Sequence, residues 1–165
     1  MANIQAAEQF NAEDEDTLRG KYLIFTVGKE LYGMEIRNIT EIIGIQPITA
    51  VPEMPEYVKG LTNLRGKVIP VMDARLRFQK EAKEYDDRTC IIVVESNGET
   101  IGLIVDSVSE VLVLENEDIS PTPELAKAGH KYITGIGKSG GSVMLLLDCK
   151  RLVSDDIFDE PAPAA

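Results

Sequence analysis

The chain has 165 residues, a formal net charge of −11 and two cysteines, which limits it to one ordinary domain or two very small ones. A unit of about 60 residues is marginally stable alone, so two such halves are expected to stabilise each other by contact. The acidic residues gather at both ends, residues 1–19 and 154–165, which we expect to be flexible tails. No apolar run approaches the ~18 residues of a membrane span and no export leader is seen, so a cytoplasmic protein is expected.

The first half of the chain, residues 20–79, predicts short strands separated by turns. The expected strands are residues 22–27, 31–36 and 38–45. Prolines 47, 52 and 55 then interrupt the apolar pattern, and residues 56–59 fit a single helical turn. The stretch 60–73 adds a turn and a β-branched strand, and residues 74–78 are expected to form a short helix.

After a charged connector, residues 80–88, the same kind of pattern returns in residues 89–153. Strands are expected at residues 90–94, 100–105, 133–136 and 143–147, with the apolar residues Val108, Val111 and Val113 following the second of them. The pair Asn97-Gly98 is a strong hairpin signal, and short helices are expected near residues 124–128 and 150–158. Short strands with many turns predict an all-β, barrel-type chain with a few short helices.

The two halves also resemble each other in order. Residues 33–42 align with 102–111, residues 48–53 with 119–124, and residues 60–73 with 135–148, at offsets of 69, 71 and 75. Offsets that only grow are typical of loop insertions in a duplicated unit. Chance similarity between aliphatic strands is the alternative. Exchange of strands between the two units is left open.

The stretch 60–73 contains the most informative turn. Asn63 and Gly66 suit the first and fourth positions of a type I turn, which directs the Arg65 side chain outward. In the other half Arg65 corresponds to Gly140. The matched pairs, which the fold alone explains, are Gly60 with Gly135 and Val68 with Val143. The unmatched arginine therefore points to recognition, with a structural ion pair to the neighbouring unit as the alternative.

Catalytic and metal-binding patterns are missing from the sequence. His130 lies in a polar loop without metal-ligand spacing. Glu41 and Glu110 occupy matching places in the repeat and are expected to lie far apart. The glycine-rich run 135–141 lacks the spacing of a phosphate-binding loop. Cys90 and Cys149 are expected to be buried free thiols, so neither an enzyme nor a cofactor is predicted.

Nucleic-acid binding is a second alternative, because residues 59–83 hold seven basic residues against Asp73 and Glu81. Phe78 is the only aromatic residue there that bases can stack on, and the whole chain is acidic. A protein-binding module is therefore favoured. An apolar groove between two barrels is a natural site, with Ile39 and Val105 as outward-facing candidates to line it.

Several of these residues together resemble the CheW-type chemotaxis coupling proteins. The resemblance covers about residues 20–153 and is most specific in Asn63-Leu64-Arg65-Gly66 with the following residues 68–73. It is supported by residues 23–25, by the approach through Pro52, Pro55 and Gly60, and by residues 102–106. The kinase CheA shares the module, but this chain has no phosphotransfer or ATP-binding segment, which favours the free-standing coupler.

The resemblance implies two tandem SH3-like five-stranded β-barrels and a scaffold without catalytic activity. The scaffold is expected to couple the cytoplasmic tips of methyl-accepting chemotaxis receptors to the regulatory domain of CheA, in membrane-associated arrays. The receptor-facing residues that it implies are Ile39, Glu41, Gly60, Arg65, Val105 and Val108. The kinase-facing residues that it implies are Ile43, Ile45 and Ile48. Arg65→Glu is then expected to leave the fold intact and to disrupt signalling.

Overall fold

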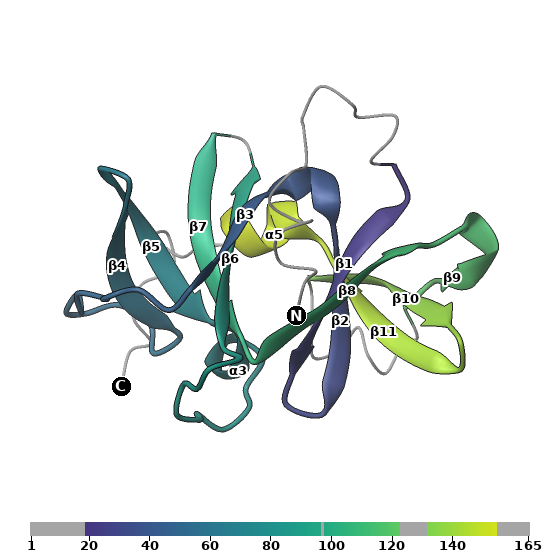
Figure 1. The fold of residues 1–165 in the computed structure, drawn as a ribbon, viewed down its shortest axis with the longest axis horizontal. Coiled ribbons are helices and arrows are strands. Elements are labelled where there is room, and N and C mark those ends of the chain that lie inside the picture. Colours follow the sequence, from purple (N-terminus) through teal and green to yellow (C-terminus); the bar gives the residue numbers. More distant parts are fainter. Residues whose placement is uncertain (1–18, 97, 123–131, 155–165) are drawn as a thin grey trace.

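The computed structural model describes residues 19–96, 98–122 and 132–154, and these form two β-sheets that lie side by side (Figure 1). The six-stranded sheet has the order β8-β1-β2-β11-β10-β9 and the five-stranded sheet the order β3-β6-β7-β5-β4. The expected all-β character with short helices is confirmed. The strands of the first half are β1 Lys21–Val27, β2 Glu30–Glu35, β3 Ile39–Gly44, β4 Val58–Leu64 and β5 Lys67–Asp73. Those of the second half are β6 Cys90–Ser96, β7 Glu99–Val105, β8 Ser107–Val113, β9 Ile119–Ser120, β10 Ile133–Ser139 and β11 Ser142–Leu147.

Helices are few and short among these residues. The 3₁₀ turns η2 and η3 span Ile36–Asn38 and Asn116–Asp118, and the α-helices α3 and α5 span Ala74–Arg77 and Cys149–Ser154. The helical turn expected at residues 56–59 is wrong, because β4 begins at Val58 and pairs with Met72 of β5. The helix expected near residues 124–128 lies outside the described residues, as do His130 and most of both acidic ends.

Each sheet takes strands from both halves of the chain. The five-stranded sheet combines β3, β4 and β5 with β6 and β7, and the six-stranded sheet combines β1 and β2 with β8 to β11. The chain thus leaves the six-stranded sheet after β2 and returns to it after β7. The division of the chain into two repeated units, residues 20–79 and 89–153, remains a prediction from the sequence. The two sheets do not coincide with these units, because each contains strands of both.

The reason for the exchange is the length of the two crossovers. A hairpin needs at least two loop residues, but Asp106 alone separates β7 from β8, so β8 cannot fold back onto β7 and instead pairs with β1. The other crossover, η2, likewise carries the chain from β2 to β3, which pairs with β6. Both crossovers send the third strand of a sequence unit into the other sheet.

The two sheets have the same strand order when each strand is numbered by its place in the sequence repeat. The order β3-β6-β7-β5-β4 corresponds to β8-β1-β2-β11-β10, with β9 as an added edge strand. Each also has one parallel contact at the same place, β5 with β7 and β11 with β2. A duplicated unit would produce this correspondence.

The matched aspartates Asp73 and Asp148 have the same local role. The backbone N–H of Asp73 donates to the Tyr57 carbonyl and that of Asp148 to the Tyr132 carbonyl, each at 2.7 Å. The Asp73 carboxylate then accepts hydrogen bonds from the N–H groups of Arg75 and Leu76, and so caps α3. The Asp148 carboxylate accepts one from the Arg151 N–H in α5. Each aspartate lies at the junction between a strand and the helix that follows it.

A continuous apolar core lies between the sheets. Every residue from Cys90 to Val94 in β6 is buried, because the strand packs on both faces. Ile91 and Val93 pack with Ile69 and Val71 inside the five-stranded sheet. Ile92 belongs instead to a larger cluster that joins both sheets and α5. The seam between the sheets is therefore packed with side chains.

Candidate protein-binding site

Arg65 lies at the tip of the β4–β5 hairpin in a left-handed backbone conformation. Leu64 pairs with Lys67, which leaves Arg65 and Gly66 as a two-residue loop with φ of 54° and 86°. Positive φ at both positions is typical of a type I′ turn, so the expected type I turn is wrong. A type I′ turn prevails because its twist matches the twist of the paired strands. The Asn63 side chain supports the loop by accepting the Gly66 N–H at 2.7 Å.

This conformation is unusual for arginine. The left-handed region costs a non-glycine residue roughly 1–2 kcal/mol, and the equivalent hairpin between β10 and β11 avoids this cost with Gly140 and Gly141 at φ of 56° and 82°. The fold therefore accepts glycine at this position, and arginine is the less favourable choice. Local strain of this kind is concentrated at functional sites. The Arg65 side chain is 74% exposed, as expected.

Arg65 meets a second candidate residue, Glu41. The Arg65 Nη1 atom lies 2.6 Å from Glu41 Oε2, and the Glu41 side chain is only 16% exposed. Glu41 belongs to β3, so this ion pair joins the hairpin tip to another strand of the same sheet and the same sequence unit. Exposed pairs contribute little stability, about 0.2–1 kcal/mol. The contact places two of the receptor-facing candidates together.

Beside this pair lies a small hollow of about 220 Å³. Its apolar floor includes the buried residues Ile69 and Val93, and its rim is charged. The rim and wall residues are Thr40, Glu41, Leu64, Arg65, Lys67, Glu95 and Thr100. An apolar floor inside a charged rim suits one protein side chain better than a small polar substrate.

The other receptor-facing candidates are less exposed than expected. Ile39 and Val105 retain only 7% and 1% of their exposure and lie in the core cluster, so the expectation that they face outward is wrong. Ile39 begins β3 and Val105 ends β7, and both side chains pack into the cluster that joins the two sheets. Val108 in β8 is half-buried against the same cluster. Gly60 is buried in β4, where its backbone touches Thr49.

The kinase-facing candidates divide between core and surface. Ile43 and Ile48 are partly buried against the core of the five-stranded sheet, while Ile45 just after β3 is 37% exposed. Ile45 is thus the candidate whose side chain is most available to a partner.

Two exposed valines are candidate site residues that the sequence interpretation misses, because it attributes the matched pair Val68 and Val143 to the fold alone. Val68 and Val143 occupy equivalent positions in β5 and β11 and are 59% and 57% exposed, so burial in the fold does not explain them. Their exposure can be predicted from the alternation of side chains along a strand. Each valine is followed by a buried residue, Ile69 or Met144, so the valine itself faces the opposite side.

The basic stretch 59–83 does not form an open row of cations. Four of its side chains make ion pairs, which are Arg65 with Glu41, Arg75 with Asp106, Lys80 with Glu30 and Lys83 with Asp86. The guanidinium of Arg77 lies over the rings of Tyr57 and Tyr132, 4.5 and 4.9 Å from their centroids. Charges engaged in this way are poorly placed to follow a phosphate backbone.

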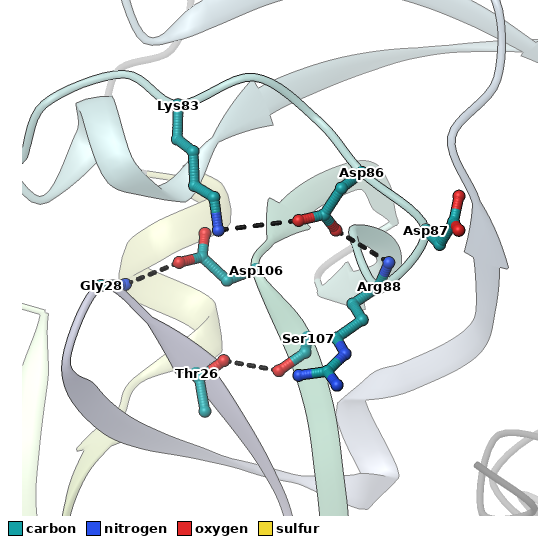
Figure 2. A pocket seen from close by; sticks show the side chains of 8 residues that line it. All are labelled: Thr26, Gly28, Lys83, Asp86, Asp87, Arg88, Asp106 and Ser107. Carbon is teal, nitrogen blue, oxygen red and sulfur yellow. Dashed lines mark hydrogen bonds and ion pairs between the residues drawn. The ribbon is translucent and has the colours of Figure 1, made fainter.

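A larger hollow of about 470 Å³ lies at the other end of the five-stranded sheet (Figure 2). Its hydroxyl groups, on Thr26 and Ser107, bond each other at 2.6 Å. Its carboxylates are engaged by Lys83, by the Arg88 N–H or by the Gly28 N–H, except that of Asp87 (Figure 2). None of the residues that line this hollow is a nucleophile paired with a base, which acyl or phosphoryl transfer would need.

The described residues were compared with the requirements of a metal site and of a membrane span. In these parts of the chain, no three His, Cys, Asp or Glu side chains lie together as metal ligands would, and none of the helices is long and apolar enough to span a membrane. Cys90 and Cys149 are free and buried, as expected. Burial raises the pKa of both thiols.

Comparison with known proteins identifies relatives over most of the chain. A family model described as the CheW-like domain matches residues 21–156. Chemotaxis protein CheW of Klebsiella aerogenes is 38% identical over 142 residues, which cover 86% of this chain and 86% of that protein. Chemotaxis protein CheW of Helicobacter pylori is 33% identical over 144 residues, covering 87% and 86%.

A solved structure is also similar. The crystal structure of scaffolding protein TtCheW from Thermoanaerobacter tengcongensis superposes with a TM-score of 0.74 at 35% sequence identity, and it covers 78% of this chain and 88% of that one. The similarity includes sequence and fold together, across nearly all of the described residues. The chain therefore belongs to the CheW-like family.

Proposed function

We propose that the protein is a non-catalytic chemotaxis scaffold that couples the cytoplasmic tips of chemoreceptors to the histidine kinase CheA. The observation that carries this function is the CheW-like match across residues 21–156, in a chain whose relatives are named chemotaxis proteins. The scaffold acts in the cytoplasm, at membrane-associated receptor arrays. It needs no cofactor, binds no nucleic acid and does not insert into the membrane.

The fold supports this function by geometry. Two SH3-like barrels, each built from strands of both copies of a duplicated unit, hold the receptor and kinase at fixed relative positions. The equal strand order of the two sheets supports the duplication. A small rearrangement of the receptor then changes the relative stability of kinase conformations.

The receptor surface is centred on Arg65. Its strained backbone has no explanation in the fold, since glycine occupies the equivalent position. A receptor helix lies in an apolar groove between the two barrels, gains affinity from apolar contact and is oriented by Arg65 and Glu41. Ile39, Gly60 and Val105 shape this surface from below, and the half-buried Val108 borders it. The kinase domain contacts the segment around Ile45, which Ile43 and Ile48 anchor to the core.

Arg65→Gly tests the receptor surface without disturbing the turn. Because glycine suits the left-handed conformation but adds freedom to the unfolded chain, the free energy of unfolding is expected to stay within about 1 kcal/mol of wild type. Affinity for a purified receptor tip fragment is expected to fall at least about tenfold, as for a central arginine of an interface. Urea unfolding and binding calorimetry measure the two quantities.

Gly140→Arg is the matched control, since it introduces the same strained arginine on the equivalent hairpin. It is expected to destabilise the fold by roughly 1–2 kcal/mol and to leave receptor binding unchanged. If Arg65→Gly instead lowers stability and retains full affinity, Arg65 is a structural residue and the proposed surface is wrong.

A further inference from the structure

The two crossovers between the sheets are held by different forces. At the crossover between β7 and β8, the single residue Asp106 is followed directly by the first residue of β8. Its carboxylate receives Arg75 Nε at 2.9 and 3.1 Å to its two oxygens and Arg75 Nη2 at 2.7 Å. The two side chains are only 18% and 19% exposed. A two-pronged pair of this kind fixes orientation as well as distance.

The same carboxylate reaches the other sheet. It accepts the backbone N–H of Gly28, in the β1–β2 turn, at 2.9 Å (Figure 2). The Asp106 N–H donates to the Thr26 carbonyl at 3.0 Å. Since Arg75 belongs to α3, which directly follows β5, one side chain connects the end of the five-stranded sheet to a turn of the six-stranded sheet.

Neighbouring contacts reinforce this connection. Lys80, just beyond α3, makes an ion pair with Glu30 at the start of β2. Arg75 Nη1 donates to the Glu81 carbonyl at 3.0 Å, which ties the segment after α3 to the same guanidinium. Phe78 stacks on Tyr32 of β2 with ring centroids 4.8 Å apart. All of these contacts lie on the side of the molecule where α3 meets the β1–β2 turn.

The equivalent crossover, η2, lacks this arrangement. The residue that aligns with Asp106 is Arg37, which is 51% exposed and makes an ion pair at 3.5 Å with Glu35, two residues away. That pair joins η2 to the end of β2, the strand directly before it, and does not reach the five-stranded sheet. At η2 the sheets are held by packing, through the fully buried Ile36.

We propose that the Asp106–Arg75 pair is a lock that sets the angle between the two sheets at one crossover, and that the scaffold depends on it to transmit receptor state. The role of the lock in transmitting receptor state rests on the proposed function, because the receptor-facing candidates include Val108 in one sheet and Arg65 in the other. A loosened lock leaves each sheet folded and lets their relative orientation vary. Coupling then fails while each separate binding surface survives.

Nuclear magnetic resonance on the full chain, with no partner present, tests the lock itself. Residual dipolar couplings are fitted separately for the two sheets in wild type, R75Q and the control R37Q. Wild type and R37Q are expected to share one alignment tensor across both sheets, whereas R75Q is expected to need two different tensors. Because the Asp106 carboxylate is no longer held by Arg75 and can move away from Gly28, hydrogen exchange at the Gly28 amide is expected to accelerate about tenfold or more in R75Q.

R75K provides the same test if R75Q unfolds, because lysine keeps the charge but loses the two-pronged geometry. It is expected to show a smaller change in the same direction. One common tensor and unchanged Gly28 exchange in both Arg75 variants would overturn the lock. So would equal effects of R37Q and R75Q, since the two crossovers would then be alike.

A second measurement distinguishes the lock from the scaffold function. The affinity of R75Q for a receptor tip fragment alone, and for the CheA regulatory domain alone, is expected to stay within about threefold of wild type. Activation of CheA in a mixture of receptor, full-length CheA and R75Q is expected to fall at least about tenfold. Full activation by a variant with two tensors would overturn the signalling part of the inference. Absence of ternary activation with the wild type would reject the proposed function, and the dipolar couplings would still decide the lock.

Discussion

At the scale of single residues, Gly60 is a site candidate whose position leaves no room for a side chain. A Cβ atom there would lie 2.0 Å from the Thr49 carbonyl oxygen, and φ is 145°, a region that side chains rarely adopt. The close approach allows Thr49 and Leu61 to pair at 2.8 Å in both directions. Gly60 therefore positions the segment before β4, and its effect on any partner is indirect.

Gly60→Ala is expected to destabilise the protein by about 3 kcal/mol or more, because both a backbone clash and backbone strain must be relieved. Gly66→Ala is the control, since its Cβ would meet open space and only the positive φ opposes it. That variant is expected to lose about 1 kcal/mol. Urea unfolding compares the two, and equal losses would contradict the role of the Thr49 contact.

Asp106 is expected to make the free energy of unfolding depend on pH. Burial by itself raises the pKa of Asp106, but hydrogen bonds from Arg75 and the Gly28 amide, with the charges of Arg75 and Lys83, lower that pKa overall. A carboxyl group with a lowered folded-state pKa stabilises the fold above its unfolded pKa, about 3.9. This contribution is lost as the pH falls through the folded-state value.

The expected result is that wild type loses more stability than Asp106→Asn between about pH 5 and pH 2.5, so that the two unfolding free energies converge in acid. Urea titrations at a series of pH values measure the difference. A difference that stays constant over this range would show that the charge on Asp106 contributes nothing.

At the scale of elements, the side chains of β3 and of the residues after it become progressively more exposed along the chain. Ile42 is buried at 1%, Ile43 is partly buried against the core of the five-stranded sheet, and Ile45 is 37% exposed. An apolar side chain at the end of a strand, backed by a packed one, is suited to binding because the strand holds it in place.

Ile45→Asp is therefore expected to change the free energy of unfolding by less than about 0.5 kcal/mol, as surface substitutions do. It is expected to weaken binding of the CheA regulatory domain at least about tenfold. Ile43→Asp, which places a charge against the core, is the contrast and is expected to destabilise the fold by several kcal/mol. Unchanged kinase binding by a folded Ile45→Asp variant would remove this segment from the kinase surface.

At the scale of the whole molecule, the two sheets share one core. Cys90 in β6 and Cys149 in α5 belong to the same cluster of buried side chains, and α5, although it follows β11, packs against β6 (Figure 1). Burial raises the pKa of Cys149 to about 12, with Asp148 and Glu35 adding to the effect. Both thiols are thus protonated and covered in the folded protein at neutral pH.

The expected outcome is that a thiol reagent at pH 8 labels both cysteines slowly and at one common rate in dilute denaturant, because exposure of either needs the shared core to open. Mass spectrometry after digestion follows the two sites separately, with the fully unfolded protein as the control for intrinsic reactivity. Labelling of one site far ahead of the other would show that the sheets open independently.

The local elements could largely be predicted from the sequence. Most strands, and the hairpin that joins β6 to β7, follow from alternating aliphatic residues and from turn residues such as Asn97-Gly98, since these signals depend on neighbours along the chain. The turn type at Arg65 could not, because an arginine at positive φ contradicts local preference and is accepted only once β4 and β5 pair. The predicted outward orientation of Ile39 and Val105 is also wrong, because the pattern along a strand does not show which of its faces the rest of the fold covers.

The sequence by itself determined the strand content, the family resemblance in residues 60–73 and the absence of a catalytic pattern, all of which depend on residue types and short spacing. The tertiary structure alone decided which strands share a sheet, that Glu41 meets Arg65, and that Asp106 connects Arg75 to the β1–β2 turn. These outcomes depend on burial and on hydrogen-bond partners far apart in the chain. No local pattern specifies them, because the same strand can satisfy its backbone against several neighbours until the core is packed.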